Sequence, residues 1–190
     1  MYNYPMFPAV FLDRDGVIIE NVPIYVRSWA DVEFLPGSLE ALARLAAGPY
    51  KVVMVTNQSA VGRGILSLAQ AEAINACILE IIRQAGGRVD GAYICPHGPQ
   101  DACDCRKPLP GLLLKAAAEL DIDLGRSIMI GDALTDLQAG QAAGVMRSFL
   151  VLTGRGLEQA ALPGAAQLAS GGVYPDLAAV LAGWLPQTDS

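Results

Sequence analysis

The sequence predicts an α/β fold in which a Rossmann-like parallel sheet carries helices on both faces. Short apolar segments rich in β-branched residues alternate along the chain with longer segments of helical periodicity. A polar or reactive residue stands at the end of each of the first four apolar segments, as expected where parallel strands end at one ligand-binding edge. The alternation runs on without an internal repeat or a low-complexity tract, which favours a single domain over residues 1–190.

Five strands are expected, with right-handed crossovers between them. The apolar segments that predict these strands lie at 8–12, 51–55, 91–95, 127–131 and 148–152. A stretch rich in proline, glycine and alanine near 163–173 is interpreted as a surface loop.

Five helices fit the intervening segments, at 37–47, 67–85, 111–121, 134–143 and 175–184. Ser67 and Gln70 form a plausible capping box at the start of the second helix. Gly86 follows that helix, and Gly144 follows the fourth, where each is suited to end it. Cys77 lies inside the second helix and is expected to be a core residue.

The composition indicates a folded protein that neither spans a membrane nor binds nucleic acid. Hydrophobic residues make up 53% of the chain and charged residues 17%, which disfavours disorder. No stretch reaches the roughly 18 apolar residues needed to cross a bilayer. Met1–Val10 lacks the pattern of a secretory signal, so we expect a cytoplasmic protein. We also expect a monomer. A net charge of −6 means that a phosphorylated substrate must be met by a metal and a few well-placed Lys or Arg side chains.

Two aspartates follow the first strand. Residues i and i+2 of an extended chain point the same way, so Asp13 and Asp15 can approach one centre. Such a pair can supply a nucleophile that forms an acyl phosphate and an acid that protonates the leaving oxygen. Gly16 allows the chain to turn sharply after them. The simpler interpretation is an ordinary Asp-Gly turn.

Hydrogen-bonding and cationic side chains follow the second and third strands. Thr56-Asn57-Gln58-Ser59 offers donors for phosphate oxygens, although polar residues are common after any strand. Lys107 is a mobile charge suited to a phosphoryl group, whereas Arg106 offers a planar fork for a second anionic or polyhydroxyl part of a substrate. Taken alone, an Arg-Lys pair is usually solvated surface.

Two further acids follow the fourth strand. Asp132 can either cap the next helix or join Asp13 in holding Mg²⁺, a cation that prefers carboxylates, water and phosphate. Asp136 lies one helical turn further on and is expected to hold Lys107 or a metal-bound water.

As an ordered set, these motifs resemble the four motifs of the haloacid dehalogenase superfamily of phosphatases, over roughly residues 9–140. The resemblance implies a single phosphatase domain in which Asp13 is the nucleophile and Asp15 the general acid and base. It implies that Thr56 and Lys107 hold the phosphoryl group. The implied ligands of Mg²⁺ are Asp13, the backbone carbonyl of Asp15, and Asp132.

The only histidine and three of the four cysteines fall within eleven residues, in the order Cys95, His97, Cys103 and Cys105. Three sulfurs and one imidazole complete a closed tetrahedral zinc site, so we expect a structural Zn²⁺. The alternative is a cluster of reduced thiols. Because the last ligand directly precedes Arg106 and Lys107, a zinc-binding loop would fix both cations.

The spacing leaves no room for a cap domain, so substrate selection falls to loops at about 19–35, 57–66 and 95–110. Segments such as Gly62-Arg63-Gly64 and Cys103-Asp104-Cys105-Arg106-Lys107-Pro108 are similar to a capless branch of the superfamily that acts on sugar bisphosphates. That similarity implies that Arg106 binds the phosphate that is not cleaved. The residues implied to contact the substrate are Asn21, Val22, Pro23, Ile24, Asn57, Gln58, Ser59 and Arg106.

The implied substrate is D-glycero-D-manno-heptose 1,7-bisphosphate, cleaved at C7, a precursor of lipopolysaccharide heptose. Histidinol phosphate is the alternative, because its phosphatases share every catalytic residue named above. A polynucleotide 3′-phosphatase is disfavoured by the acidic balance. A zinc-stabilised binding module that has lost activity is disfavoured because Asp13, Asp15, Lys107 and Asp132 are all present.

Overall fold

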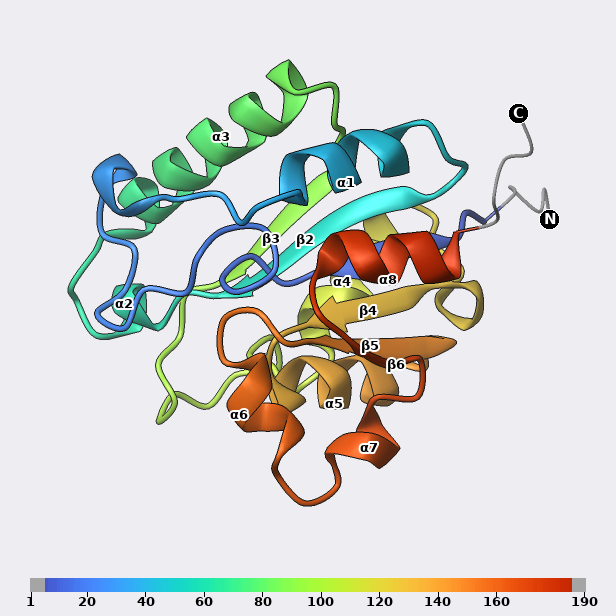
Figure 1. Ribbon diagram of the computed structural model, residues 1–190. Coiled ribbons are helices and arrows are strands. Elements are labelled where there is room, and N and C mark those ends of the chain that lie inside the picture. Colours follow the sequence, from blue (N-terminus) through green and yellow to red (C-terminus); the bar gives the residue numbers. More distant parts are fainter. Residues whose placement is uncertain (1–5, 186–190) are drawn as a thin grey trace, which may run out of the picture.

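Six parallel strands form one sheet in the computed structural model, which describes residues 6–185 (Figure 1). The spatial order is β3-β2-β1-β4-β5-β6, so β1 and β4 lie at the centre. The strands are β1 (Ala9–Leu12), β2 (Lys51–Asn57), β3 (Gly91–Cys95), β4 (Ile128–Gly131), β5 (Arg147–Val151) and β6 (Gly172–Tyr174). The predicted α/β fold with a Rossmann-like parallel sheet is confirmed. Residues 1–5 and 186–190 of the predicted domain lie outside the described residues.

Strand β1 shows why the sheet is buried on both faces. Its four residues are all fully buried, as expected for a central parallel strand covered by helices. Val10 and Leu12 pack into one apolar cluster, and Ala9 and Phe11 pack into a second cluster on the opposite face. This is the period-two alternation of an extended chain.

Helices cover both faces of the sheet. Helices α1 (Ser38–Ala46), α3 (Leu68–Gln84) and α8 (Leu177–Trp184) contribute to the cluster of Val10 and Leu12, and Figure 1 shows them on one side of the strands. Helices α4 (Gly111–Glu119) and α5 (Leu134–Ala143) contribute to the cluster on the other side. All five predicted helices are present, and the Ser67–Gln70 capping box begins α3 as expected.

Several short elements were not expected from the sequence. They are the 3₁₀ turns at Trp29–Asp31 and Leu124–Arg126, and the helices α2 (Ser59–Gly62), α6 (Gly156–Ala160) and α7 (Ala165–Leu168). The interpretation of 163–173 as a plain surface loop was wrong, because this stretch contains α7 and the start of β6. Strand β6 is a three-residue edge strand that pairs only with β5, too short to show a periodic pattern.

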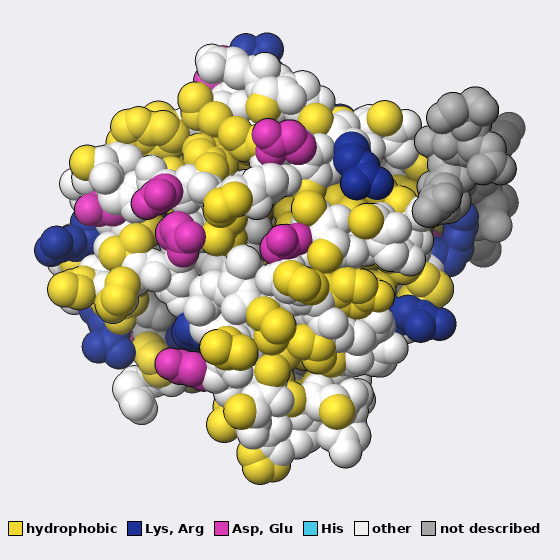
Figure 2. All heavy atoms as spheres, viewed as in Figure 1, with side chains coloured by type: hydrophobic (Ala, Val, Ile, Leu, Met, Phe, Trp, Pro, Cys, Tyr) yellow, Lys and Arg dark blue, Asp and Glu magenta, His cyan; other side chains and the backbone are white. Residues whose placement is uncertain are grey.

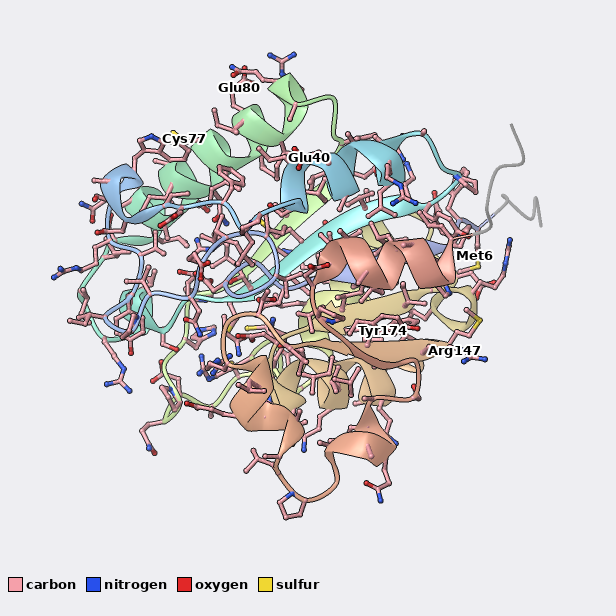
Figure 3. The ribbon with its side chains drawn as sticks, viewed as in Figure 1. Met6, Glu40, Cys77, Glu80, Arg147 and Tyr174 are labelled. Carbon is pink, nitrogen blue, oxygen red and sulfur yellow. The ribbon has the colours of Figure 1, made fainter. Side chains whose placement is uncertain are left out.

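The expectation that Cys77 is a core residue was also wrong, because it is exposed on the outer side of α3 (Figure 3). The residues of α3 that reach the core are spaced at Ile74, Ile78 and Ile82, and a cysteine at 77 falls outside that stripe.

Parallel pairing brings the carboxyl ends of β1, β2 and β4 to one edge, with β1 between the other two. Asp13 directly follows β1 and Asp132 directly follows β4, while Thr56 and Asn57 are the last residues of β2. Between Gly16 and β2, the chain forms one 3₁₀ turn and helix α1, and no inserted domain stands over this edge in the described residues.

Within residues 6–185, no helix combines the length and the apolar character that crossing a membrane requires. Lys and Arg side chains lie scattered singly on the face shown in Figure 2.

Candidate active site

The ammonium of Lys107 joins two acidic residues from different elements at the carboxyl edge of the sheet. Its Nζ lies 2.8 Å from Asp13 Oδ1 and 2.6 Å from Asp136 Oδ1, and it donates to the carbonyl of Val55 at 2.9 Å. The side chains of Lys107 and Asp136 are 2% and 1% exposed, so the ion pairs are shielded from water. The sequence left open whether Asp136 holds Lys107 or a metal-bound water, and the structure places it against Lys107.

Burial and charge act in opposite directions in this cluster. Burial raises the pKa of Asp13 to about 7, the Lys107 ammonium opposes that rise, and Asp136 and Asp15 add to it. Burial alone would lower the pKa of Lys107, but the carboxylates of Asp13 and Asp136 outweigh it and raise that pKa. Lys107 therefore stays charged at every working pH.

The backbone around Lys107 is fixed by Asn57 at the end of β2. The Asn57 amide donates to the Lys107 carbonyl at 3.0 Å and accepts from the Lys107 N–H at 3.1 Å. On the other side, Asp136 accepts from the Ala133 N–H at 3.1 Å, which holds its second carboxylate oxygen. The amine is therefore positioned from strand β2 and from helix α5 at once.

Asp15 is held by three side chains. Arg14 donates to both of its carboxylate oxygens, at 3.1 and 2.9 Å. Gln58 Nε2 donates to Asp15 Oδ2 at 3.2 Å and to Thr56 Oγ1 at 2.8 Å, and Thr56 Oγ1 lies 3.4 Å from the same Asp15 oxygen. The first and second predicted motifs therefore meet at this carboxylate.

A divalent cation fits the acidic cluster of Asp13, Asp132 and Asp136. One carboxylate oxygen from each of these three buried residues lies within 4.8 Å of the others. Burial, followed by the charge of Asp13, raises the pKa of Asp132, although Arg155 opposes the rise. Asp136 uses both carboxylate oxygens, on Lys107 and on the Ala133 N–H, whereas Asp13 contacts Lys107 through Oδ1 alone. Asp13 and Asp132 are therefore the two acids that suit a hard cation such as Mg²⁺.

Close backbone approach around Asp132 requires glycine. Gly16 has a φ of +84°, and a Cβ there would collide with the Asp132 carboxylate. Thr153 Oγ1 donates to the Gly16 carbonyl at 2.6 Å, which holds this turn against the loop after β5. Asp132 itself accepts from the Arg155 N–H at 2.8 Å and does not cap helix α5, whose N-cap is Ala133.

A cavity of about 580 Å³ opens over these residues. Arg106 lies on its wall, where Nη1 donates to Ser59 Oγ at 2.8 Å and to the His97 carbonyl at 3.1 Å. Ile24 was expected to contact substrate, but it is 68% exposed and is not among the lining residues. The predicted residues that line the cavity are Asp13, Asp15, Asn21, Val22, Pro23, Thr56, Asn57, Gln58, Ser59, Arg106 and Lys107.

Some lining residues were not predicted, because no motif marks them. Arg14, Tyr25, Val26, Thr135, Gly154 and Arg155 also face the cavity. For Arg14 the sequence does contain a signal, because a basic residue flanked by two acids favours an ion pair. Arg155 comes from a loop far along the chain, and only the fold brings it to Asp132.

The four predicted zinc ligands converge. Cys95 Sγ lies 3.2 Å from Cys105 Sγ and 3.9 Å from Cys103 Sγ, and His97 Nδ1 lies 3.5 Å from Cys95 Sγ and 3.3 Å from Cys105 Sγ. A tetrahedral zinc with bonds of about 2.3 Å to sulfur sets its sulfurs about 3.8 Å apart. Burial, followed by the neighbouring sulfurs, raises the pKa of the Cys105 thiol to about 12, and a bound cation would offset that rise.

A buried lysine and paired aspartates at the carboxyl edge of a parallel sheet are the side chains that an α/β phosphatase needs to transfer a phosphoryl group through an aspartate. Residues 104–180 match the family described as HAD-hydrolase-like. The chain is 43% identical over 174 residues to the D-glycero-beta-D-manno-heptose-1,7-bisphosphate 7-phosphatase of Bordetella bronchiseptica, which covers 90% of this chain and 94% of that protein. It is 39% identical over 172 residues to the enzyme of the same name from Pseudomonas aeruginosa, with the same coverage of 90% and 94%.

The fold also agrees with a solved structure. The crystal structure of D,D-heptose 1,7-bisphosphate phosphatase from B. bronchiseptica, complexed with magnesium and phosphate, has a TM-score of 0.87 and 42% identity, over 94% of this chain and 98% of that one. The chain belongs to the haloacid dehalogenase superfamily of hydrolases.

Proposed function

We propose that the protein hydrolyses the 7-phosphate of D-glycero-β-D-manno-heptose 1,7-bisphosphate with the help of Mg²⁺. The observation that carries this proposal is the convergence of Asp13, Lys107 and Asp132 under a cavity that also presents Arg106. A bisphosphate needs two cationic contacts on the protein, one at the phosphate that leaves and one at the phosphate that stays. The relatives in Bordetella and Pseudomonas carry this activity in their names, which supports the choice of sugar and anomer.

The residues divide the reaction into two displacements at phosphorus. Both Lys107 and the Arg14 N–H contact Asp13 Oδ1, so neither occupies Oδ2, which we assign as the attacking atom. As the new bond to phosphorus forms, the bond to the C7 oxygen breaks and Asp15 gives that oxygen a proton. Water then attacks the aspartyl phosphate, Asp15 takes back a proton, and inorganic phosphate leaves.

Charge on the transferring group is met by fixed cations and donors. Lys107 faces the phosphoryl oxygens, and Thr56 adds a hydroxyl donor at the end of β2. Mg²⁺, held by Asp13, the Asp15 carbonyl and Asp132, would supply further positive charge to that group. The sugar would be bound by 21–23 and 57–59, with Arg106 on the 1-phosphate.

We infer that Cys95, His97, Cys103 and Cys105 hold a structural Zn²⁺. Four protein ligands leave no open position for substrate, so the metal would act by fixing the loop that carries Arg106 and Lys107. We also propose that the chain works as a monomer in the cytoplasm, on a precursor of lipopolysaccharide heptose.

The test is a comparison of kcat/KM on the β heptose 1,7-bisphosphate and on histidinol phosphate. We expect a preference of about 10²-fold or more for the heptose, because histidinol phosphate offers Arg106 no second phosphate and a site built for a polar group discriminates strongly against ligands that lack it. Arg106→Met should erase most of that preference. A larger value for histidinol phosphate would overturn the assignment of substrate and leave the chemistry standing.

A further inference from the structure

The side chain of Arg14, between the two aspartates of the first motif, is buried. It is only 1% exposed, yet it carries a full charge. Its Nε and Nη2 donate to the two oxygens of Asp15 at 3.1 and 2.9 Å, as a fork on one carboxylate. The remaining nitrogen, Nη1, donates to Asn75 Oδ1 at 2.8 Å. Every nitrogen of the guanidinium is therefore committed to one of these two residues.

Asn75 reaches this site from the middle of helix α3, 61 residues along the chain from Arg14. It is 4% exposed, and its Nδ2 has no hydrogen-bond partner among residues 6–185. Burying an amide donor without a partner costs free energy. Turning the amide over would bring its NH₂ group against the guanidinium, so the observed orientation is the one that serves Arg14.

The two hydrogen bonds of the fork fix the guanidinium relative to the Asp15 carboxylate, but they do not fix it relative to the rest of the protein. The third bond, to Asn75, fixes the guanidinium on helix α3. Helix α3 is a firm anchor, since Ile74 and Ile78 pack into the apolar cluster on this face of the sheet. Gln58 and Thr56 restrain the same carboxylate from β2 and its following turn.

We propose that Asn75 and Arg14 are positioning residues that aim Asp15 at the oxygen of the leaving group. This inference rests on the proposed function, in which Asp15 is the general acid. Neither residue transfers a proton. Asn75 acts on the reaction only through Arg14, and Arg14 acts only through the direction in which the Asp15 carboxyl points.

The dependence on the leaving group separates this role from a merely structural one. An alkoxide such as a sugar oxygen needs a proton as it leaves, whereas p-nitrophenolate leaves readily without one. General acid catalysis is worth about 10²- to 10⁴-fold. A misaimed Asp15 should therefore lower kcat/KM for a sugar phosphate and spare kcat/KM for p-nitrophenyl phosphate, because kcat/KM reports the phosphorylation of Asp13 and not the later hydrolysis in which Asp15 acts as base. A damaged fold should lower both values equally.

The experiment measures kcat and KM on a sugar phosphate and on p-nitrophenyl phosphate. Asn75→Leu removes the acceptor and keeps a side chain of similar size, Asn75→Asp keeps an acceptor oxygen for Arg14, and Ile78→Val disturbs the same helix away from Arg14. For Asn75→Leu we expect kcat/KM on the sugar phosphate to fall by about tenfold or more, a fraction of the general-acid effect. We expect less than about a twofold loss of kcat/KM on p-nitrophenyl phosphate. Asn75→Asp should recover most of the loss, and Ile78→Val should show no selective effect.

Equal losses on both substrates, or no loss on either, would overturn the inference. Asn75→Ala serves as the second variant should Asn75→Leu not fold. The variant Asp15→Asn distinguishes a failure of the positioning role of Asn75 from a failure of the general-acid role of Asp15. If Asp15→Asn spares kcat/KM for p-nitrophenyl phosphate and Asn75→Leu does not, only the positioning role fails; if Asp15→Asn lowers kcat/KM alike for both substrates, the general-acid assignment fails with it.

Discussion

The ammonium of Lys107 lies between two carboxylates in a region from which water is excluded. Lys107→Met would leave Asp13 and Asp136 buried without a counter-charge. We expect the free energy of unfolding at pH 8 to fall by about 3 kcal/mol or more, because removing one partner strands a buried charge. Urea denaturation of the metal-free protein measures this.

Lys115 provides the matched control for that variant. It is 63% exposed, and its Nζ lies 4.0 Å from Glu119 on the same helix. Lys115→Met should change the free energy of unfolding by less than about 0.5 kcal/mol, as for other exposed pairs. Equal effects of the two substitutions would mean that the charges of Asp13 and Asp136 do not depend on Lys107.

The raised pKa of Asp13 predicts a pH dependence of stability. Its pKa is 3.8 ordinarily and about 7 in the folded protein, so between these values the folded state holds the extra proton. Asp13 therefore adds stability that is fully present below about pH 4 and is lost as the pH rises through 7. Measured without metal, the free energy of unfolding of the wild type minus that of Asp13→Asn should fall over this range. A difference that rises with pH would show instead that Lys107 holds Asp13 ionised in acid.

Much of the candidate site could be predicted from single residues, because its chemistry depends on motifs that stand at strand ends. Asp13, Thr56, Lys107 and Asp132 are of this kind. Asn75 is not, since nothing in a helical sequence marks one polar residue on its inner face as the partner of a distant arginine. Arg155 was missed because it lies in a loop far along the chain, and Ile24 was placed at the cavity by the family resemblance, as the last residue of a range whose first three residues do line it.

At the scale of elements, the loop between β3 and α4 joins the four zinc ligands to Arg106 and Lys107. Cys95, Cys103 and Cys105 reach the second apolar cluster, and Asn57 holds the backbone of Lys107. A bound metal would add a restraint that ties all four ligands together. We expect Cys103→Ser to lose zinc and to lower kcat/KM by about 10²-fold, because displacing a catalytic group by about 1 Å has an effect of that size. Metal analysis and steady-state kinetics test this together.

The mechanism should survive the loss of zinc. The dependence of the residual rate on Mg²⁺, and its abolition by Asp13→Asn, should be the same in Cys103→Ser as in the wild type. Cys77→Ser is the matched control, since that cysteine is exposed on α3 and stands outside the cluster of four ligands. Complete loss of zinc from Cys103→Ser with unaltered kinetics would refute the role given to this loop.

Long elements were predictable and short ones were not. Helix α3 is recognisable in the sequence because its 17 residues carry an apolar stripe and begin with a capping box. Strand β6 and helix α7 have three and four residues, too few for either period to appear. Strand β6 forms where it can pair with the edge of β5, and there the Tyr174 ring lies 5.8 Å from that of Phe149.

At the scale of the whole molecule, a net charge of −6 surrounds a site that must accept an anion. The positive charge that the substrate meets is therefore local, from Lys107, Arg106 and a bound metal. The monomeric state stays a prediction, tested by light scattering after gel filtration. A mass near 19.9 kDa that does not change with concentration is the expected result, and a stable mass of twice that value would contradict it.

The most direct test is to trap the phosphorylated enzyme. Rapid acid quenching during turnover with Mg²⁺, followed by borohydride reduction and peptide mass spectrometry, converts an aspartyl phosphate into homoserine at the modified position. We predict homoserine at position 13 in the wild type and none in Asp13→Asn, which should also release no phosphate. Modification at another residue, or full phosphate release by Asp13→Asn, would contradict the assignment of Asp13 as the nucleophile.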